Sequence, residues 1–311
     1  FILAWVYAVL LIPGCGGGGE SLTTLSVGTL HTIYAMPLGL AAVGNRPVFD
    51  PIFEGNGLDV HIVYFEDSSQ MENALVAGEI DAALTDFAAA FVLNQESEQV
   101  KVVMTVLRPY SRATPLWALL KAPGASSPEI VGQRLAIPKG ITPRYIGEEV
   151  LDDLEVDPES VEWLEVEDGW AALTALENGE AAAALVPEPA LSAAMERGAI
   201  SVADNRWSLL SQLVVLFRKP LVDESLDALK NEKTAVVKQF IKSYEQAIWE
   251  LNSKAESGEY RDLMMEMGEL SPDTGDSLST VLFPWPADIP IEFEVENMNR
   301  WLLAQGVLSQ P

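Results

Sequence analysis

An eleven-residue stretch of this chain occurs twice, and the repetition limits the folds that the chain can adopt. Residues 74–84 read ALVAGEIDAAL and residues 175–185 read ALENGEAAAAL, so the copies lie 101 positions apart. The match continues upstream at the same spacing, where residues 60–75 (VHIVYFEDSSQMENAL) align with residues 161–176 (VEWLEVEDGWAALTAL). One register held over such a length indicates a duplicated structural unit, rather than two alanine-rich helices that are alike by chance.

Each copy predicts the same series of elements. Alternating apolar residues predict a strand, an acidic pair follows, and a helix comes next. Asp67 and Asp168 stand where a carboxylate caps the first N–H groups of a helix, while Gly78 and Gly179 stand where a left-handed residue ends one. The short apolar strand after each glycine lacks polar alternation, which is typical of a parallel strand covered on both faces.

The segments that precede the two copies extend the unit. Residues 25–42 and 134–151 both read as a strand, a glycine-containing loop and a helix. We therefore expect an α/β protein with two lobes, each a mostly parallel sheet flanked by helices.

Two crossover segments are expected to join these lobes around a hinged cleft. The pattern places 22–112 and 221–311 in the first lobe and 113–220 in the second, with a strand at 212–218 closing the second lobe. The helical pattern after residue 223 predicts that the C-terminal helices pack back onto the first lobe.

Composition excludes several classes of function. The 311 residues include 46 acidic and 19 basic residues, a net charge of −27, which argues against nucleic acid or anionic lipid as a partner. The single cysteine cannot form an intramolecular disulfide, and the two histidines lie far apart, so we expect no metal site and no cofactor. The chain has no G-x-S-x-G, P-loop or H-E-x-x-H motif, so we expect no catalytic residues.

The first residues read as an export signal. Residues 1–12 are continuously apolar but too short to span a bilayer as a helix. We expect 1–14 to be a signal peptide that lacks its own start, because the sequence shows no initiator Met and no basic region there. Residues 11–15 (LIPGC) resemble a bacterial lipobox, which predicts lipidation of Cys15 and a glycine-rich tether over 15–21. A membrane-anchor stub and a cytosolic chain with an apolar start are the alternatives.

One stretch carries a family resemblance. VGQRLAIPKGIT (residues 131–142) and ALENGEAAA (residues 175–183) are similar to motifs of the type II periplasmic binding proteins of ABC importers. The most similar branch is the NMT1-like one, which contains nitrate, sulfonate and taurine, and thiamine-pyrimidine binders, and the resemblance covers residues 24–305. Two positions depart from the family pattern: Pro187 replaces a Trp in VPEP, and Ala182 stands where an Asp is usual, although the first copy keeps Asp81.

The resemblance implies a function without chemistry. It implies an extracytoplasmic lipoprotein, anchored to the bacterial cell membrane, that captures a small organic solute in the interlobe cleft. The solute would be anionic, zwitterionic or heterocyclic, and the protein, a monomer, would deliver it to an ABC permease. The alternatives are a sensing or scaffold lipoprotein with the same cleft and, on the same fold, an enzyme of pyrimidine or menaquinone biosynthesis.

The family's cleft residues come from loops after strands, and they map onto four loops here. Carried over by position, the resemblance implicates Thr29, His31, Tyr34, Thr85, Asp86, Phe87, Gly140, Ile141, Thr142 and Glu188, to which a linker adds Arg112.

The residues themselves support these loops but leave alternatives. Gly140 and Thr142 precede a helix that we expect to start near Pro143, so they suit an anion or simply cap the helix. Asp86 is expected either to contact the ligand or to cap the next helix. Glu188 would suit a ligand that carries positive charge or N–H donors.

Each of the remaining candidate residues also has two possible roles. Arg112 opposes an anion or forms a hinge salt bridge, and His31 is a cleft donor or a solvated loop residue. Tyr34, Phe87 and Tyr145 either form walls for a flat ligand or belong to the core.

Overall fold

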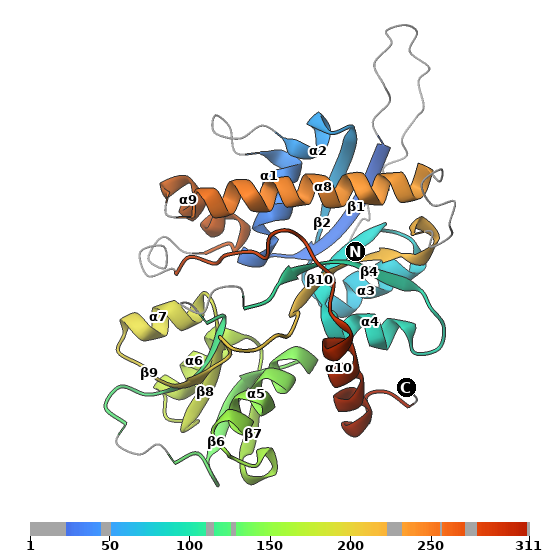
Figure 1. Ribbon diagram of the computed structural model, residues 1–311. Coiled ribbons are helices and arrows are strands. Elements are labelled where there is room, and N and C mark those ends of the chain that lie inside the picture. Colours follow the sequence, from blue (N-terminus) through green and yellow to red (C-terminus); the bar gives the residue numbers. More distant parts are fainter. Residues whose placement is uncertain are drawn as a thin grey trace, which may run out of the picture.

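Two five-stranded sheets organise the part of the chain that the structure describes. The computed structural model describes residues 23–44, 51–109, 115–125, 129–222, 232–255, 257–270 and 279–309. The strand orders are β2-β1-β3-β10-β4 and β7-β6-β8-β5-β9, one sheet in each lobe (Figure 1). The strands are β1 (Thr23–Leu30), β2 (Leu58–Phe65), β3 (Ala82–Asp86), β4 (Val100–Leu107), β5 (Trp117–Lys121), β6 (Arg134–Pro138), β7 (Glu162–Val166), β8 (Ala183–Pro187), β9 (Ile200–Asp204) and β10 (Leu213–Arg218).

Helices connect the strands and flank both sheets. They are η1 (Ile33–Ala35), α1 (Met36–Val43), α2 (Ile52–Gly55), α3 (Ser68–Ala77), α4 (Phe87–Asn94), α5 (Ile141–Asp153), η2 (Pro158–Ser160), α6 (Gly169–Glu177), α7 (Ala190–Glu196), η3 (Lys219–Leu221), α8 (Glu232–Ser253), α9 (Gly258–Met267) and α10 (Glu292–Ala304). None of these described helices is both long enough and apolar enough to cross a membrane.

The repeated stretch forms the same structure in both lobes. The N-cap carboxylates are in place, because Asp67 Oδ1 accepts from the Gln70 N–H at 3.0 Å and Asp168 Oδ1 from the Ala171 N–H at 2.8 Å. The glycines that follow, Gly78 and Gly179, have φ values of 81° and 73°, which return the chain to the sheet. The repeat therefore encodes a capped helix, a turn and a buried central strand.

Each sheet receives one strand that follows directly from the other lobe. β5 comes after β4 and runs antiparallel between β8 and β9, while β10 comes after β9 and runs antiparallel between β3 and β4. The neighbouring strands run parallel in both sheets, as in β1 with β2 and β3, and β6 with β7 and β8. The predicted α/β fold of two mostly parallel sheets is confirmed, with one reversed strand in each.

The exchange corrects one predicted boundary. The sequence pattern predicts that the strand at 212–218 belongs to the second lobe, but β10 pairs with β3 and β4 in the first sheet. An apolar run predicts a strand without identifying its partners, because pairing depends on segments far apart in the chain. The second crossover segment therefore ends before Leu213, and the second sheet ends with β9.

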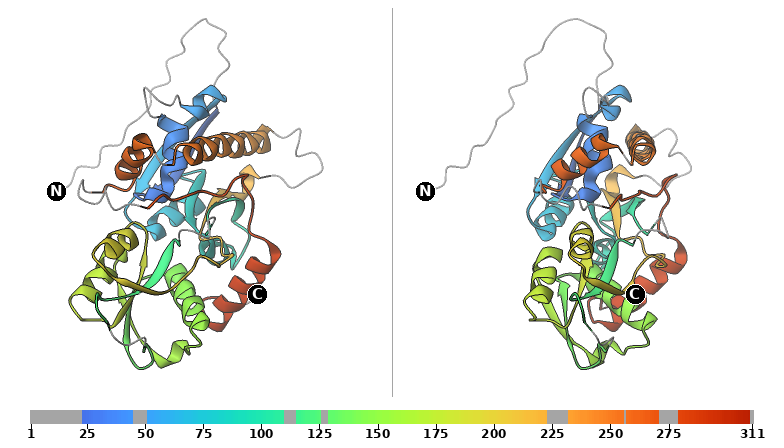
Figure 2. Two further views of the ribbon diagram at one scale, coloured as in Figure 1. Left: turned by 60° about the vertical axis from the view of Figure 1, so that its left-hand side comes forward. Right: turned by 90° about the vertical axis from the view of Figure 1, so that its left-hand side faces the viewer.

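The C-terminal helices pack on the first lobe, and the last of them contacts the second lobe as well. α8 packs on α1 and α2 of the first lobe, and α9 packs on η1 and α1, as predicted. α10 instead lies beside α5 of the second lobe in Figures 1 and 2. There Trp301 Nε1 donates a 2.7 Å hydrogen bond to Glu148, and its ring meets Tyr145 edge-on at 5.3 Å. The same helix also contacts the first lobe, where its Val295 and Asn299 meet Phe87 of α4 and Val102 of β4, so the prediction that the C-terminal helices pack on the first lobe holds for α8 and α9 and in part for α10.

Candidate functional site

A cleft of about 670 Å³ lies where the two lobes meet. Side chains from the ends of strands in both sheets line it, as expected for open α/β sheets, whose ligands bind beyond the carboxyl ends of the strands. Its lining includes Leu30, Phe65, Asp86 and Leu107 from the first lobe and Pro138 and Pro187 from the second. The two reversed strands contribute their first residues, Trp117 and Leu213.

A hydrogen bond between side chains joins the two crossover segments at the cleft. Trp117 Nε1 donates to Gln212 Oε1 at 3.0 Å, and both side chains line the cleft. The bond identifies the Gln212 oxygen as the acceptor and leaves its Nε2 buried with no hydrogen-bond partner in the described structure. The hydroxyl of Thr142, from the second lobe, is likewise buried and faces the Asp86 carboxyl group of the first lobe. Gln212 Nε2 is therefore available to a ligand.

Asp86 supplies a carboxylate at the end of β3. Although it stands at the N-cap of α4, its side chain makes no capping hydrogen bond. Burial raises the pKa of Asp86 to about 6, and the nearby Glu72 carboxylate adds to this, while the Thr142 hydroxyl opposes it. The carboxylate is therefore mostly ionised at neutral pH.

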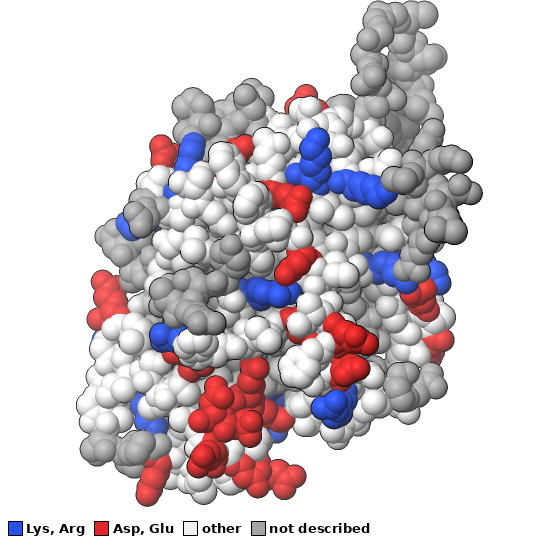
Figure 3. Space-filling model, viewed as in Figure 1, with Lys and Arg blue, Asp and Glu red and all other residues white. Residues whose placement is uncertain are grey.

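Carboxylates predominate over cations in the described lining of the cleft. The acidic side chains are Glu66, Asp67, Asp86, Glu167 and Asp168, and the Lys or Arg side chain is Lys139. Lys139 Nζ is paired with Glu167 at 2.7 Å, and His31, also in the lining, faces Glu269 at 3.3 Å and stacks on Tyr64. The outer surface is acidic too, with Asp and Glu gathered on the second lobe (Figure 3).

The structure brings about half of the predicted ligand residues to this cleft. His31, Tyr34, Thr85, Asp86 and Thr142 line it. Thr85 Oγ1 donates to Glu72 at 2.9 Å, so that hydroxyl is already engaged. Arg112 and Cys15 lie outside the described residues, so their predicted roles stay predictions.

Four predicted residues are outside the described lining for simple geometric reasons. Thr29 is buried within β1, and its hydroxyl donates to the carbonyl of Leu30. Gly140 and Ile141 form the start of α5, with Gly140 as N-cap at φ 128°, a conformation that L side chains rarely adopt. The helix begins at Ile141, two residues before the predicted start near Pro143.

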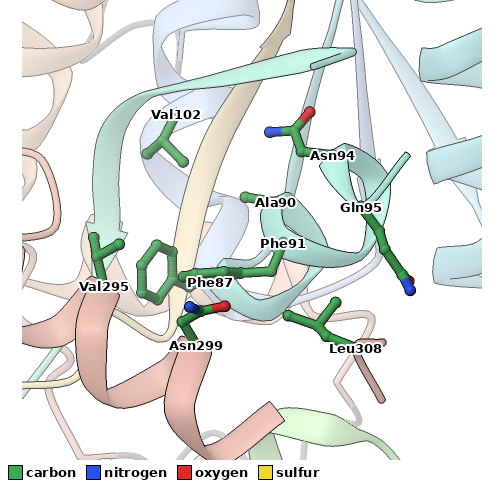
Figure 4. A pocket seen from close by; sticks show the side chains of 9 residues that line it. All are labelled: Phe87, Ala90, Phe91, Asn94, Gln95, Val102, Val295, Asn299 and Leu308. Atoms are coloured by element: carbon green, nitrogen blue, oxygen red, sulfur yellow. The ribbon is translucent and has the colours of Figure 1, made fainter. Parts of the chain in front are cut away.

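Phe87, the fourth, points away from the cleft. It is 2% exposed, packs edge-on against Phe91 at 5.1 Å, and lines a second, smaller pocket beside Val295 and Asn299 of α10 (Figure 4). Because Phe87 is the first residue of α4, the turn from strand to helix directs its side chain to the opposite side from Asp86. Tyr145 also lies outside the cleft's lining, packed against Trp301.

Glu188 lies next to the cleft but turns into the second lobe. Its carboxylate accepts from the Ser192 hydroxyl at 2.8 Å and from the Ser192 N–H at 3.1 Å, in the first turn of α7. Its carbonyl oxygen accepts a 2.8 Å hydrogen bond from the Tyr34 hydroxyl of the first lobe. Glu188 is thus 4% exposed and stabilises a helix start, and its backbone provides a contact between the lobes.

Sequence reasoning missed three cleft features. Trp117 and Gln212 stand at the starts of the crossover strands, and their approach became visible only once the strand exchange was known. Gly169 was missed because it follows a plain N-cap. A Cβ there would lie 2.6 Å from Pro187 Cδ, so α6 can approach the end of β8 only with glycine at this position.

The buried Glu188 carboxyl predicts a pH-dependent stability. Burial raises its pKa from 4.5 to about 7, although the hydrogen bonds from Ser192 lower it. The folded protein therefore holds this proton more tightly than the unfolded chain, so stability is full below pH 4.5 and is lost as the pH rises to about 7. We expect Glu188→Gln, which keeps the shape without the charge, to recover up to about 3 kcal/mol at neutral to alkaline pH.

Urea unfolding of both proteins at several pH values measures this effect. The stability difference between variant and parent should grow from low to neutral pH. Glu196→Gln on the same helix is the control, because Glu196 is exposed and should change little. A Glu188→Gln variant that loses as much stability as the parent over that pH range would contradict the assignment.

Comparison with known proteins identifies the family of the chain and similar solved structures. A family model described as NMT1/THI5 like matches residues 52–252, more than half of the chain. The fold is similar to that of the periplasmic aliphatic sulphonate binding protein SsuA from Escherichia coli, with 15% identity, a TM-score of 0.72, and coverage of 93% of this chain and 95% of that one. No curated protein matches the sequence significantly.

Two further solved structures show the same likeness. The alkanesulfonate-binding protein SsuA from Xanthomonas axonopodis pv. citri, bound to MOPS, has 16% identity and a TM-score of 0.67, with coverage of 94% and 96%. The ligand-binding component of an ABC-type import system from Staphylococcus aureus, with zinc bound, has 16% identity and a TM-score of 0.66, with coverage of 93% and 94%. At these identities the likeness shows the shared two-lobed fold.

Proposed function

Because this chain belongs to the NMT1/THI5-like family, we propose that it is the solute-binding component of an ABC import system. It captures a small organic solute in the interlobe cleft and presents it to a membrane permease. The similar proteins from Escherichia coli and Staphylococcus aureus are named as binding components of this kind, which supports the proposal.

The observation that carries the proposal is the cleft between lobes joined by two crossover segments. A solute there would touch Asp86 of the first lobe and Thr142 of the second, so a closed arrangement satisfies both halves of the site at once. The lobes rotate about the crossovers, where Trp117 meets Gln212. The Tyr34–Glu188 hydrogen bond is a further contact available to the closed form.

The protein captures its solute without changing it chemically, and it works as a monomer on the outer side of the cell membrane. The lipobox-like residues 11–15 support a lipid anchor at Cys15, which would keep the protein close to its permease.

Binding by the full chain tests this function. Thermal unfolding and small-angle scattering are measured with alkanesulfonates, taurine, nitrate, thiamine pyrimidines, amino acids and organic amines. A true solute at 100 times its Kd adds about 2.7 kcal/mol of stability, reduces the radius of gyration by lobe closure, and is recovered chemically unchanged. Conversion of the compound would indicate an enzyme, and binding without closure would contradict the hinge.

A further inference from the structure

We propose that the solute of this cleft is a small organic cation, whose positively charged nitrogen binds the carboxylate of Asp86. This inference rests on the proposed function and narrows it to one class of solute.

Asp86 lines the cleft and does not cap the helix that it precedes. Its side chain makes no cap on α4, in contrast to Asp67 and Asp168, which cap α3 and α6. The duplicated unit provides a comparison, because the matching position in the second lobe, 101 residues later, is Pro187. An acid at the end of this strand is therefore not needed to build the unit, and it lines the cleft in one lobe alone.

The charges around Asp86 favour a cation over an anion. Among the described residues that line the cleft, the Lys or Arg side chain is Lys139, and Glu167 already neutralises it. Glu72, behind Thr85, adds a further carboxyl group close to Asp86. A sulfonate or nitrate in this position would face carboxylates with no uncommitted cation in the described lining, whereas an organic cation would relieve their mutual repulsion.

Other groups in the cleft indicate what the rest of the solute contains. Within the described part of the chain, Gln212 Nε2 is a buried donor without a partner, and an acceptor oxygen or nitrogen on the solute would satisfy it. Tyr34 and Trp117 line the same cleft, and aromatic rings attract an organic cation as well as its apolar body. The solute class is thus a protonated amine or amidinium that also carries a hydrogen-bond acceptor.

The experiment identifies which compound of a mixture the protein binds. The full chain, freed of solute by repeated dilution and concentration, is incubated with a small-molecule extract of bacterial cells as the probe. Bound compounds are released by heat and identified by mass spectrometry. Capture of a compound with a positively charged nitrogen is expected. Capture of an anion or a neutral compound overturns the charge assignment and leaves the proposed function standing, while capture of nothing contradicts the proposed function itself.

Two matched variants test the role of Asp86 with the captured compound. Asp86→Asn is expected to weaken its affinity about 100-fold, because one charge-assisted hydrogen bond is lost. The control is Asp81→Asn, which changes the residue just before the same strand; Asp81 pairs with Arg218 away from the cleft, and affinity should be unchanged. Because burial penalises the Asp86 charge, Asp86→Asn should fold with an undiminished Tm at neutral pH. Unchanged affinity in a folded Asp86→Asn variant would overturn the proposal.

Discussion

Phe217→Ala is expected to lower the free energy of unfolding by about 3–5 kcal/mol, the range for a fully buried phenylalanine. Phe217 is 0% exposed and lies in β10, between β3 and β4. Its ring meets Phe240 of α8 edge-on at 5.2 Å, and Phe240 stacks on Phe53 at 5.0 Å. Alanine leaves a cavity where three elements of the first lobe meet.

The loss of stability at Phe217 should also affect the cleft, because of the position of β10. The strand enters the first sheet directly after the second crossover, so its packing holds the cleft residues Gln212 and Leu213 in place. Urea unfolding measures the effect, and Phe293→Ala on α10 is the control because Phe293 is 57% exposed. A loss below about 1 kcal/mol for Phe217→Ala would mean that the core closes around the cavity.

Glu294→Ala is the second change with a large expected effect, a loss of about 3 kcal/mol. Glu294 is 4% exposed on α10, and its carboxylate accepts from the hydroxyl of Ser211 at 3.3 Å. It also faces the guanidinium of Arg108 at 3.6 Å. Arg108 follows β4, and Ser211 precedes β10, so this cluster joins both crossover segments to one helix. Alanine would leave the charge of the half-buried Arg108 partly unpaired, although Asp288 at 3.2 Å still faces it.

Denaturant unfolding again provides the measurement, with Glu292→Ala as the control on the same turn of α10, where the side chain is exposed. The conservative change Glu294→Gln should lower the free energy of unfolding less, since the amide oxygen still accepts from Ser211. If Glu294→Ala and Glu292→Ala proved equally stable, the cluster would contribute nothing to the junction of the lobes.

The candidate site was predictable where a local pattern places a residue at a strand end. Asp86 and Thr142 follow apolar strands, and such positions lie on the ligand edge of an α/β sheet whatever the rest of the chain does. The direction of a side chain at such an edge was not predictable. Phe87 and Glu188 occupy matching positions in the two copies, yet both turn away from the cleft, one to α10 and one to the first turn of α7.

The duplicated unit, its caps and its left-handed glycines followed from residue order alone, because each depends on neighbours a few positions apart. The strand exchange, the boundary before Leu213, the bridging position of α10 and the meeting of Trp117 with Gln212 did not. Each of these depends on which distant segments pair. That choice rests on the burial and hydrogen bonding summed over the whole fold, which no local pattern contains.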